Sequence, residues 1–279
     1  MITLLLATRN GHKAGEIRSI LGDKFGYLTL IDCPQAPVVK EDAATFAANA
    51  TKKSVELAEW ASSSGIRSAV RRTATEGGQN TLRVAFVLAD DSGLEVDALN
   101  GAPGVHSARF AALDAGHTGN SSDVENNAKL LDLLKDVPLE KRTARFRCVL
   151  ALTPVVEPGA EAASPTCNAD DFQLKTELFE GACEGRLDFA PRGRGGFGYD
   201  PLFIPMGYRQ TFAELGEDVK NQLSHRAKAL AKLKLVLESL AGDGRASSRT
   251  LKTGRQRGGN PWKGLRHTSH AQHPDESGC

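Results

Sequence analysis

The sequence lacks any hydrophobic run that approaches the length of about 20 residues needed to span a membrane. Met1 leads directly into the first apolar segment, residues 2–7, which leaves no room for a signal or transit peptide. We therefore expect a cytoplasmic protein with no membrane partner.

Paired cysteines and an excess of charge of one sign are also missing. The five cysteines include no Cys-x-x-Cys pair and no nearby histidine at a ligand spacing, so they support neither a zinc site nor a disulfide framework. We expect Cys148 and Cys183 to be small buried hydrophobic residues. The formal net charge is only +1, so the overall charge gives no reason to require nucleic acid as a partner.

A chain of 279 residues with 40% hydrophobic residues is long enough to bury a substantial core in one large domain. We assign that domain to residues 1–242, with a polar insertion at about 62–83 and an enlarged hairpin connection at about 154–171. Residues 243–279 hold seven lysines and arginines against three acidic residues, and their few apolar residues predict a disordered basic tail. Such a tail has the charge to touch RNA, but a dispensable extension is the more economical interpretation.

Strand and helix patterns alternate through the domain. Strands are expected at residues 2–7, 28–32, 84–90, 143–153 and 173–182. Helices are expected through Ile17 and Leu21, at 45–61, from the Ser122 capping box to before Pro138, and at 227–240. This order predicts an α/β fold, with a mixed central sheet flanked by helices and two lobes separated by a cleft.

Two adjacent carboxylates, Asp90 and Asp91, follow the apolar run at 84–88. We expect a buried strand that delivers both side chains to its end, where open α/β sheets place their chemistry. Adjacent carboxylates repel each other, so a fold tolerates them best where a divalent cation or water neutralises the pair. Taken alone, the pair fits a solvated turn better.

Two other segments have the composition of ligand-binding loops. Residues 8–13 follow the first strand and open a helix, so their backbone N–H groups and polar side chains can hold an anion such as phosphate. Residues 192–201 combine glycines with two arginines and two aromatic residues, which allows close approach to a ligand and stacking on it. The first pattern is common in α/β chains, and the second also fits a flexible surface loop.

Taken together, these segments resemble the inosine triphosphate pyrophosphatase family, whose members hydrolyse non-standard purine nucleoside triphosphates. The resemblance extends from residue 2 to about residue 240, and its motifs occur in chain order at residues 8–13, 41–50, 90–94, 101–109, 196–201 and 224–226. One such motif is weak, whereas six in order are specific.

The resemblance implies cleavage of ITP, dITP and XTP between the α and β phosphates, with Mg²⁺ as the cofactor and a homodimer as the assembly. The position matching Asp91 is the proton acceptor and a metal ligand, and the position matching Glu41 is the second metal ligand. Lys13 and Asp90 complete the expected catalytic set, with Asp90 supporting the metal through water. Carboxylate oxygens are the ligands that Mg²⁺ prefers.

The resemblance also implies a nucleotide-binding cleft. The expected substrate-binding residues are Thr8, Arg9, Asn10, Gly11, His12, Lys13, Ser92, Phe197, Gly198, Tyr199, Asp200, Lys220, His225 and Arg226. The phosphates are assigned to Thr8, Asn10, Lys13 and Ser92. Phe197 is expected to stack on the purine, while donors such as Arg226 favour an oxygen over an amino group at C6.

Two other functions remain open at this stage. A related pyrophosphatase would cleave other modified or pyrimidine nucleotides and would be separated by its base preference. A nucleotide- or RNA-binding protein could keep the fold without turnover and work through the basic tail. The presence of Glu41, Asp90, Asp91 and Lys13 argues against a pure binding protein, which has no need of a metal and a base.

Overall fold

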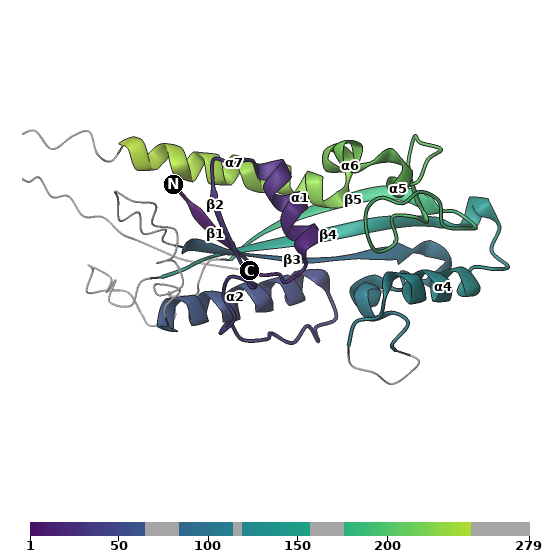
Figure 1. The fold of residues 1–279 in the computed structure, drawn as a ribbon, viewed down its shortest axis with the longest axis horizontal. Helices are drawn as coiled ribbons and strands as arrows, with labels where there is room; N and C mark the ends of the chain where they lie inside the picture. The colour runs from purple at the N-terminus through teal and green to yellow at the C-terminus, as the bar shows by residue number, and fades with distance from the viewer. Residues whose placement is uncertain (65–83, 114–118, 157–175, 247–279) are drawn as a thin grey trace, which may run out of the picture.

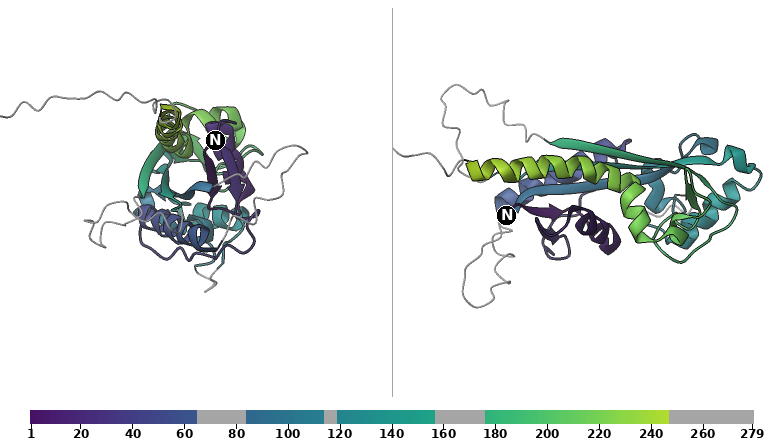
Figure 2. Two further views of the ribbon diagram at one scale, coloured as in Figure 1. Left: turned by 90° about the vertical axis from the view of Figure 1, so that its left-hand side faces the viewer. Right: turned by 90° about the horizontal axis from the view of Figure 1, so that it is seen from above.

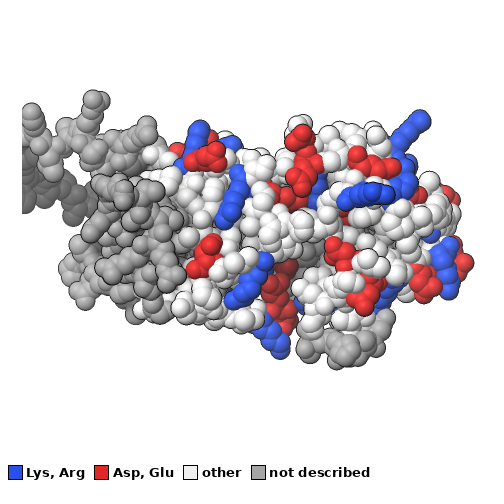
Figure 3. All heavy atoms as spheres, viewed as in Figure 1, with Lys and Arg blue, Asp and Glu red and all other residues white. Residues whose placement is uncertain are grey.

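The computed structural model describes residues 1–64, 84–113, 119–156 and 176–246. Most of the basic tail and of the two expected insertions lies outside these residues, but residues 62–64 and 243–246 belong to helices, so the predicted insertion and the predicted disordered tail both began too early. No helix in the described ranges is long and apolar enough to cross a membrane. On the face drawn in Figure 3, acidic and basic side chains are interspersed rather than gathered into a field of one sign.

A six-stranded mixed sheet with the order β2-β1-β3-β4-β5-β6 forms the centre of the fold. Its strands are β1 (Thr3–Leu6), β2 (Gly26–Thr29), β3 (Val84–Val96), β4 (Thr143–Pro154), β5 (Glu177–Leu187) and β6 (Phe203–Pro205). β1 pairs in parallel with β2 and β3, and the other neighbours pair antiparallel. The predicted mixed α/β architecture is confirmed.

Helices cover both faces of this sheet (Figure 1). The α-helices are α1 (Gly11–Leu21), α2 (Phe46–Ser64), α4 (Asp123–Leu133), α5 (Phe212–Leu215), α6 (Glu217–Leu223) and α7 (His225–Ala246). Short 3₁₀ turns are η2 (Asp97–Leu99), η3 (Gly104–Arg109) and η4 (Leu139–Lys141). In Figure 1, α1 and α7 lie on one side of the sheet, whereas α2 and α4 lie on the other.

The alternation of side chains along β4 explains this arrangement, because successive residues of a strand point to opposite faces. Cys148, Leu150 and Leu152 pack with residues of α1 and α7. Val149 and Ala151 pack with residues of α2. A strand that is apolar on both faces therefore needs a helix on each side, and burial of Cys148 agrees with the sequence prediction.

The three longest strands extend through both lobes of the molecule. β3, β4 and β5 are 13, 12 and 11 residues long, and the views in Figure 2 show the elongated body that results. At one end they pack against α1, α2, α7 and the two N-terminal strands. At the other end they contribute to a separate core that includes residues of α4, α5 and β6, and Cys183 is buried there as predicted.

Three sequence predictions about strand boundaries were wrong. The strand expected at 28–32 is β2 at Gly26–Thr29, and the strand expected at 173–182 is β5 at Glu177–Leu187. Asp90 and Asp91 do not end their strand, because β3 continues to Val96 with Asp90 opposite Leu150 and Asp91 opposite Val149. The antiparallel partner β4 satisfies the backbone of this polar stretch, so the strand does not have to stop at the carboxylates.

The parallel neighbour does stop there. β1 ends at Leu6, which lies opposite Leu88, and the chain then turns through residues 8–10 into α1. The segment of β3 that holds the carboxylates therefore borders the start of α1 instead of a further strand pair. The carboxylates can therefore be reached because β1 ends at Leu6, and not because β3 ends beside them.

Replacing Gly93 in β3 by alanine is expected to destabilise the fold. An added Cβ would lie 2.5 Å from Ser107 Oγ and 2.9 Å from Phe46 Cε1, and it would also collide with the carbonyl oxygen of Gly104. We expect a loss of about 1–3 kcal/mol in the free energy of unfolding, measured by urea denaturation. Gly15→Ala is the control, since an added Cβ meets no atom within 4 Å there, and equal stability of the two variants would contradict this account.

Candidate active site

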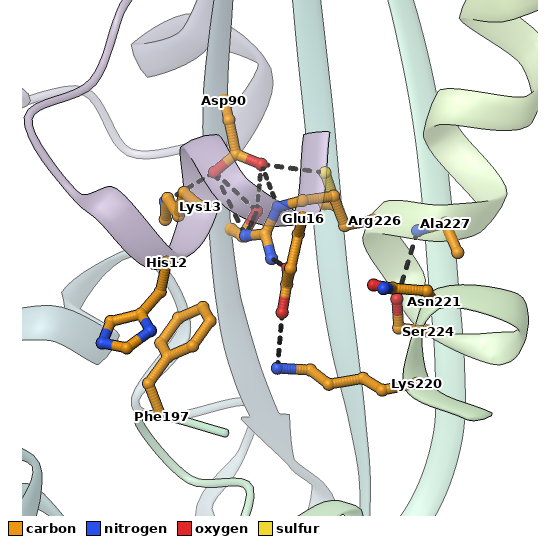
Figure 4. A network of polar contacts seen from close by, with 12 residues as sticks. His12, Lys13, Glu16, Asp90, Phe197, Lys220, Asn221, Ser224, Arg226 and Ala227 are labelled. Atoms are coloured by element: carbon orange, nitrogen blue, oxygen red, sulfur yellow. Dashed lines mark hydrogen bonds and ion pairs between the residues drawn. The ribbon is translucent and has the colours of Figure 1, made fainter. Parts of the chain in front are cut away.

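Asp90 is the most heavily hydrogen-bonded side chain of the site. Lys13 Nζ lies 2.5 Å from its Oδ1, and Arg226 Nε donates to its Oδ2 at 2.9 Å. Ser92 Oγ donates at 3.0 Å, and the thiol of Cys148 donates to Oδ2 at 3.3 Å. Figure 4 shows these groups converging on Asp90 from α1, β3, β4 and α7.

The charges around Asp90 determine its protonation state. Burial alone would raise its pKa, but Arg226 and Lys13 outweigh burial and hold the pKa of Asp90 well below its usual value. Both carboxylate oxygens already accept hydrogen bonds from protein donors. Asp90 therefore anchors the surrounding cations and is a poor acceptor for a further proton.

Asp91 points to the opposite face of the strand and has a different environment. The amide of Asn49 in α2 donates to its Oδ2 at 3.0 Å. The pKa of Asp91 is raised to about 6: burial is the main cause and the nearby Glu41 adds to it, while Lys13 opposes the shift. A carboxyl group whose pKa lies near neutrality suits a general base.

Glu41 lies beside Asp91, in the segment that precedes α2. Lys53 Nζ from α2 lies 2.5 Å from Glu41 Oε1 and donates to the carbonyl oxygen of Asp90 at 3.0 Å. Arg109 of η3 donates to the carbonyl oxygen of Glu41 at 3.1 Å. These contacts hold the Glu41 segment against β3.

The donor set fits a hard divalent cation. No group of three or more His, Cys, Asp or Glu side chains within the described ranges is already gathered as a metal site. Mg²⁺ does not need one, because it is commonly bound through one or two carboxylates while waters and substrate phosphates fill the remaining positions. Glu41 raises the pKa of Asp91, so the two carboxylates lie close enough for such a cation to relieve the repulsion on Asp91.

The loop between β1 and α1 is shaped by its own hydrogen bonds. Asn10 caps α1, and its side chain accepts from the backbone N–H groups of His12 and Lys13 at 2.9 and 3.2 Å. Thr8 Oγ1 accepts from the N–H of Asn10 at 3.0 Å. The structure therefore brings most of the predicted phosphate loop to the N-terminus of a helix, which favours anions. Arg9 instead donates to the carbonyl oxygen of Ala36 at 3.3 Å.

A cavity of about 220 Å³ lies between the start of α1, the loop at 196–197 and helix α6. Lys220 on its wall pairs with Glu16 at 2.7 Å and with Asp200 at 2.6 Å. The ammonium group of Lys220 also lies 4.3 Å from the centre of the Phe197 ring. The ring of His12 stacks on Phe197 with centroids 5.4 Å apart and planes 21° from parallel (Figure 4).

The two residues that open α7 are buried in different ways. His225 stacks on Phe146 with centroids 4.8 Å apart, and burial together with Arg226 holds its pKa well below the usual value. Its Nδ1 has no hydrogen-bond partner in the part of the chain that the structure describes. Arg226 is 1% exposed and pairs with both Asp90 and Glu16. Its guanidinium group therefore joins the phosphate side of the site to the cavity wall.

Sequence reasoning missed three residues that organise this site: Glu16, Asn49 and Lys53. A signal for two of them was present, because Asn49 and Lys53 continue the helical spacing of Phe46, Ala50 and Leu57 on the apolar face of α2. A polar residue on such a face requires a buried partner. Glu16 offers no comparable signal, since its partners come from residues more than 200 positions away.

Comparison with known proteins identifies similar chains over most of this length. The model of the Ham1 family matches residues 4–236. The dITP/XTP pyrophosphatases of Shouchella clausii and Desulforamulus reducens are 40% and 42% identical to this chain, covering 86% and 85% of it and 98% and 96% of their own lengths. The solved structure of a HAM1 protein from Coxiella burnetii has a TM-score of 0.61 at 31% identity, covering 86% of this chain and all of that protein.

The raised pKa of Asp91 predicts that its ionised carboxylate destabilises the folded, metal-free protein. Folding favours the protonated carboxyl group, so this contribution to stability is present below the ordinary pKa near 4 and is lost as pH rises through about 6. We expect Asp91→Asn to stabilise the protein at pH 8 in EDTA by at most about 3 kcal/mol, with the gain shrinking as pH falls from about 6 to about 4 and absent below that.

Urea denaturation at several pH values measures this difference. Asp132→Asn is the matched control, because Asp132 is an exposed carboxylate of α4. A variant at Asp91 that is less stable than the unmodified protein at pH 8 would show that the carboxylate is not strained.

Proposed function

This chain belongs to the Ham1 family, and on that premise we propose the reaction and the roles of its residues. The protein hydrolyses non-standard purine nucleoside triphosphates, ITP, dITP and XTP, to the nucleoside monophosphate and pyrophosphate. It is a nucleoside triphosphate pyrophosphatase.

The observation that carries the roles is the contrast between two adjacent carboxylates. Asp90 is held ionised by Lys13 and Arg226, while the pKa of Asp91 is raised to about 6. Paired carboxyl groups with separated pKa values are typical of acid and base assignments in active sites. We assign Asp91 as the base that takes a proton from the attacking water, and Asp90 as the residue that fixes the cations around it.

Pyrophosphatases of this family need a divalent cation, and we assign Mg²⁺ to this role. Glu41 and Asp91 are the residues that would hold it. When bound, the ion neutralises charge on the triphosphate and polarises the phosphoryl group under attack. Lys53 now pairs with Glu41 Oε1 at 2.5 Å, so it would compete with the ion for this oxygen.

The phosphates are assigned to the start of α1. The hydroxyl group of Thr8 provides a donor and the ammonium group of Lys13 provides positive charge, with Ser92 on the neighbouring strand. Lys13 already contacts Asp90 at 2.5 Å, so phosphate binding here would share an ammonium group that the protein has positioned in advance. Such positioning lowers the cost of ordering a flexible lysine on binding.

The purine is assigned to the cavity beside Phe197. The ring of Phe197 offers a stacking surface, with Lys220 and Arg226 over it and Asp200 bound to Lys220 and to the N–H of Phe197. His225 is assigned to the edge of the purine by the family resemblance. Gly198 and Tyr199 shape the loop that carries Phe197. A donor directed at C6 would accept the oxygen of inosine or xanthine and would leave the amino group of adenine facing another donor. A homodimer in the cytoplasm is the assembly and location that we propose with this activity.

The reaction is tested by measuring pyrophosphate and orthophosphate released from ITP, XTP, GTP and ATP, with Mg²⁺ and with EDTA. We expect pyrophosphate from ITP and XTP, loss of activity in EDTA, and weak activity on GTP and ATP. Orthophosphate as the product would place cleavage at the γ phosphate and refute the mechanism. Nucleotide binding without turnover would instead favour the binding-protein alternative.

Asp91→Asn tests the assignment of the base. The variant keeps a side chain of the same size and an oxygen that can accept from Asn49, so the fold should persist. We expect kcat for ITP to fall by a factor on the order of 10²–10⁴, the usual effect of losing a general base. Asp132→Asn should retain full activity, and an active Asp91→Asn enzyme would refute the assignment.

A further inference from the structure

Helix α4 holds the loop that carries Phe197 through two hydrogen bonds to a single residue. The N–H of Gly198 donates to Asp123 Oδ2 at 2.7 Å, and its carbonyl oxygen accepts from Asn127 Nδ2 at 2.9 Å. Asp123 and Asn127 are four positions apart on α4, so their side chains lie on the same face of the helix. Side chains on neighbouring turns of α4 therefore bind both backbone polar groups of Gly198, and we call this pair of hydrogen bonds the grip.

This grip sits next to the stacking ring. Gly198 follows Phe197 and has a φ of +64°, in the left-handed region that favours glycine. The N–H of Phe197 donates to Asp200 Oδ2 at 2.9 Å, and Tyr199 Oη donates to the carbonyl oxygen of Ser107 at 2.9 Å. The backbone on both sides of Phe197 is thus fixed by hydrogen bonds to side chains, because the loop has no strand or helix of its own.

The helix that makes the grip is itself well anchored. Its first turn has a capping box between Ser122 and Glu125. Asn126 Oδ1 accepts from the N–H of Ala111 at 2.9 Å. Beyond its C-terminal end, the buried Arg142 donates to the carbonyl oxygen of Leu134 at 2.6 Å. In Figure 1, α4 lies on the face of the sheet opposite α5 and α6, so the loop is held from the side away from the cavity-lining α6.

Burial of the Asn127 side chain costs free energy, which indicates that this amide has a specific role. The residue is 8% exposed, and its Oδ1 is buried without a hydrogen-bond partner among the described residues. A buried amide with one unpaired group costs free energy that an apolar side chain of similar size would avoid. The hydrogen bond to Gly198 is what the amide provides in return.

We propose that Asp123 and Asn127 are positioning residues for purine recognition, which act by fixing the plane of Phe197 before the substrate arrives. This inference rests on the proposed function, since it requires the purine to stack on Phe197. The groups assigned to phosphate and metal lie on α1, β3 and the Glu41 segment, whereas the hydrogen bonds of these two side chains within the described residues go to Gly198. Loss of the grip should therefore weaken binding of ligands with a base and spare ligands without one.

The test compares two products of the reaction, IMP and inorganic pyrophosphate, titrated calorimetrically into the full chain with Mg²⁺. We expect Asn127→Ala to weaken IMP binding about tenfold and the exposed Asp123→Ala about threefold, the range for a lost hydrogen bond. Pyrophosphate affinity should change less than about twofold, and the loss in kcat/KM for ITP should appear in KM.

Two further variants separate positioning from general stability. Asp123→Asn keeps an oxygen that can accept from Gly198 and should restore IMP affinity. Asp132→Ala removes another exposed carboxylate of α4 and should leave both affinities unchanged. Thermal denaturation of each variant shows whether it is folded at the titration temperature, and Asp123→Asn and Asp123→Ala provide the test if Asn127→Ala is not.

Three results would overturn the proposal. Equal weakening of IMP and pyrophosphate would mean that α4 supports the whole site rather than the ring. Unchanged IMP binding in both alanine variants, with normal ITP turnover by the unmodified protein, would refute the positioning role of Asp123 and Asn127 and leave the proposed function standing. Failure of the unmodified protein to bind IMP or cleave ITP would refute the proposed function together with this inference.

Discussion

The buried ion cluster around Asp90 is the interaction on which the rest of the site depends. It joins β3 to Lys13 of α1 and to Arg226 of α7, and Arg226 continues through Glu16 to Lys220. Removing one member of a buried cluster leaves an uncompensated charge that is costly in a low-dielectric interior. The cluster therefore makes three elements that are distant in the sequence form together or not at all, and it links the phosphate side of the cleft to the base side.

The same cluster explains how two adjacent acids acquire different roles. Neighbouring residues of a strand face opposite sides of the sheet, so Asp90 meets the cations of α1 and α7 while Asp91 meets α2. Asp90 is neutralised by the protein, whereas Asp91 faces Asn49 and another carboxylate, Glu41. On the α2 side, the ion pair of Lys53 with Glu41 compensates only part of the charge of the two carboxylates, and the remainder is the charge that a cation and a water molecule can use.

Much of the fold could be predicted from the sequence, because apolar periodicity and short motifs are local signals. The structure brings many of the predicted site residues together around Asp90 and Phe197, and their roles stay predictions. The end of β3 could not be predicted, because it depends on β4, whose backbone pairs with the polar stretch 60 residues away from it (Asp90 with Leu150). Helices α5 and α6 are too short for a clear period. Glu16 was missed because its role exists only once Lys220 and Arg226 are folded against it.

The continuity of β3, β4 and β5 through both lobes has a mechanical consequence. Residues 86–96 of β3 pair with β4 without interruption, and β4 pairs with β5 over ten successive positions. The lobes are therefore connected by a continuous hydrogen-bonded sheet rather than by a flexible linker. A rotation of one lobe against the other would have to break or distort the hydrogen bonds between these strands. We therefore expect substrate entry to be accommodated by side chains such as His12, which stacks on the fixed ring of Phe197, and not by rotation of the lobes.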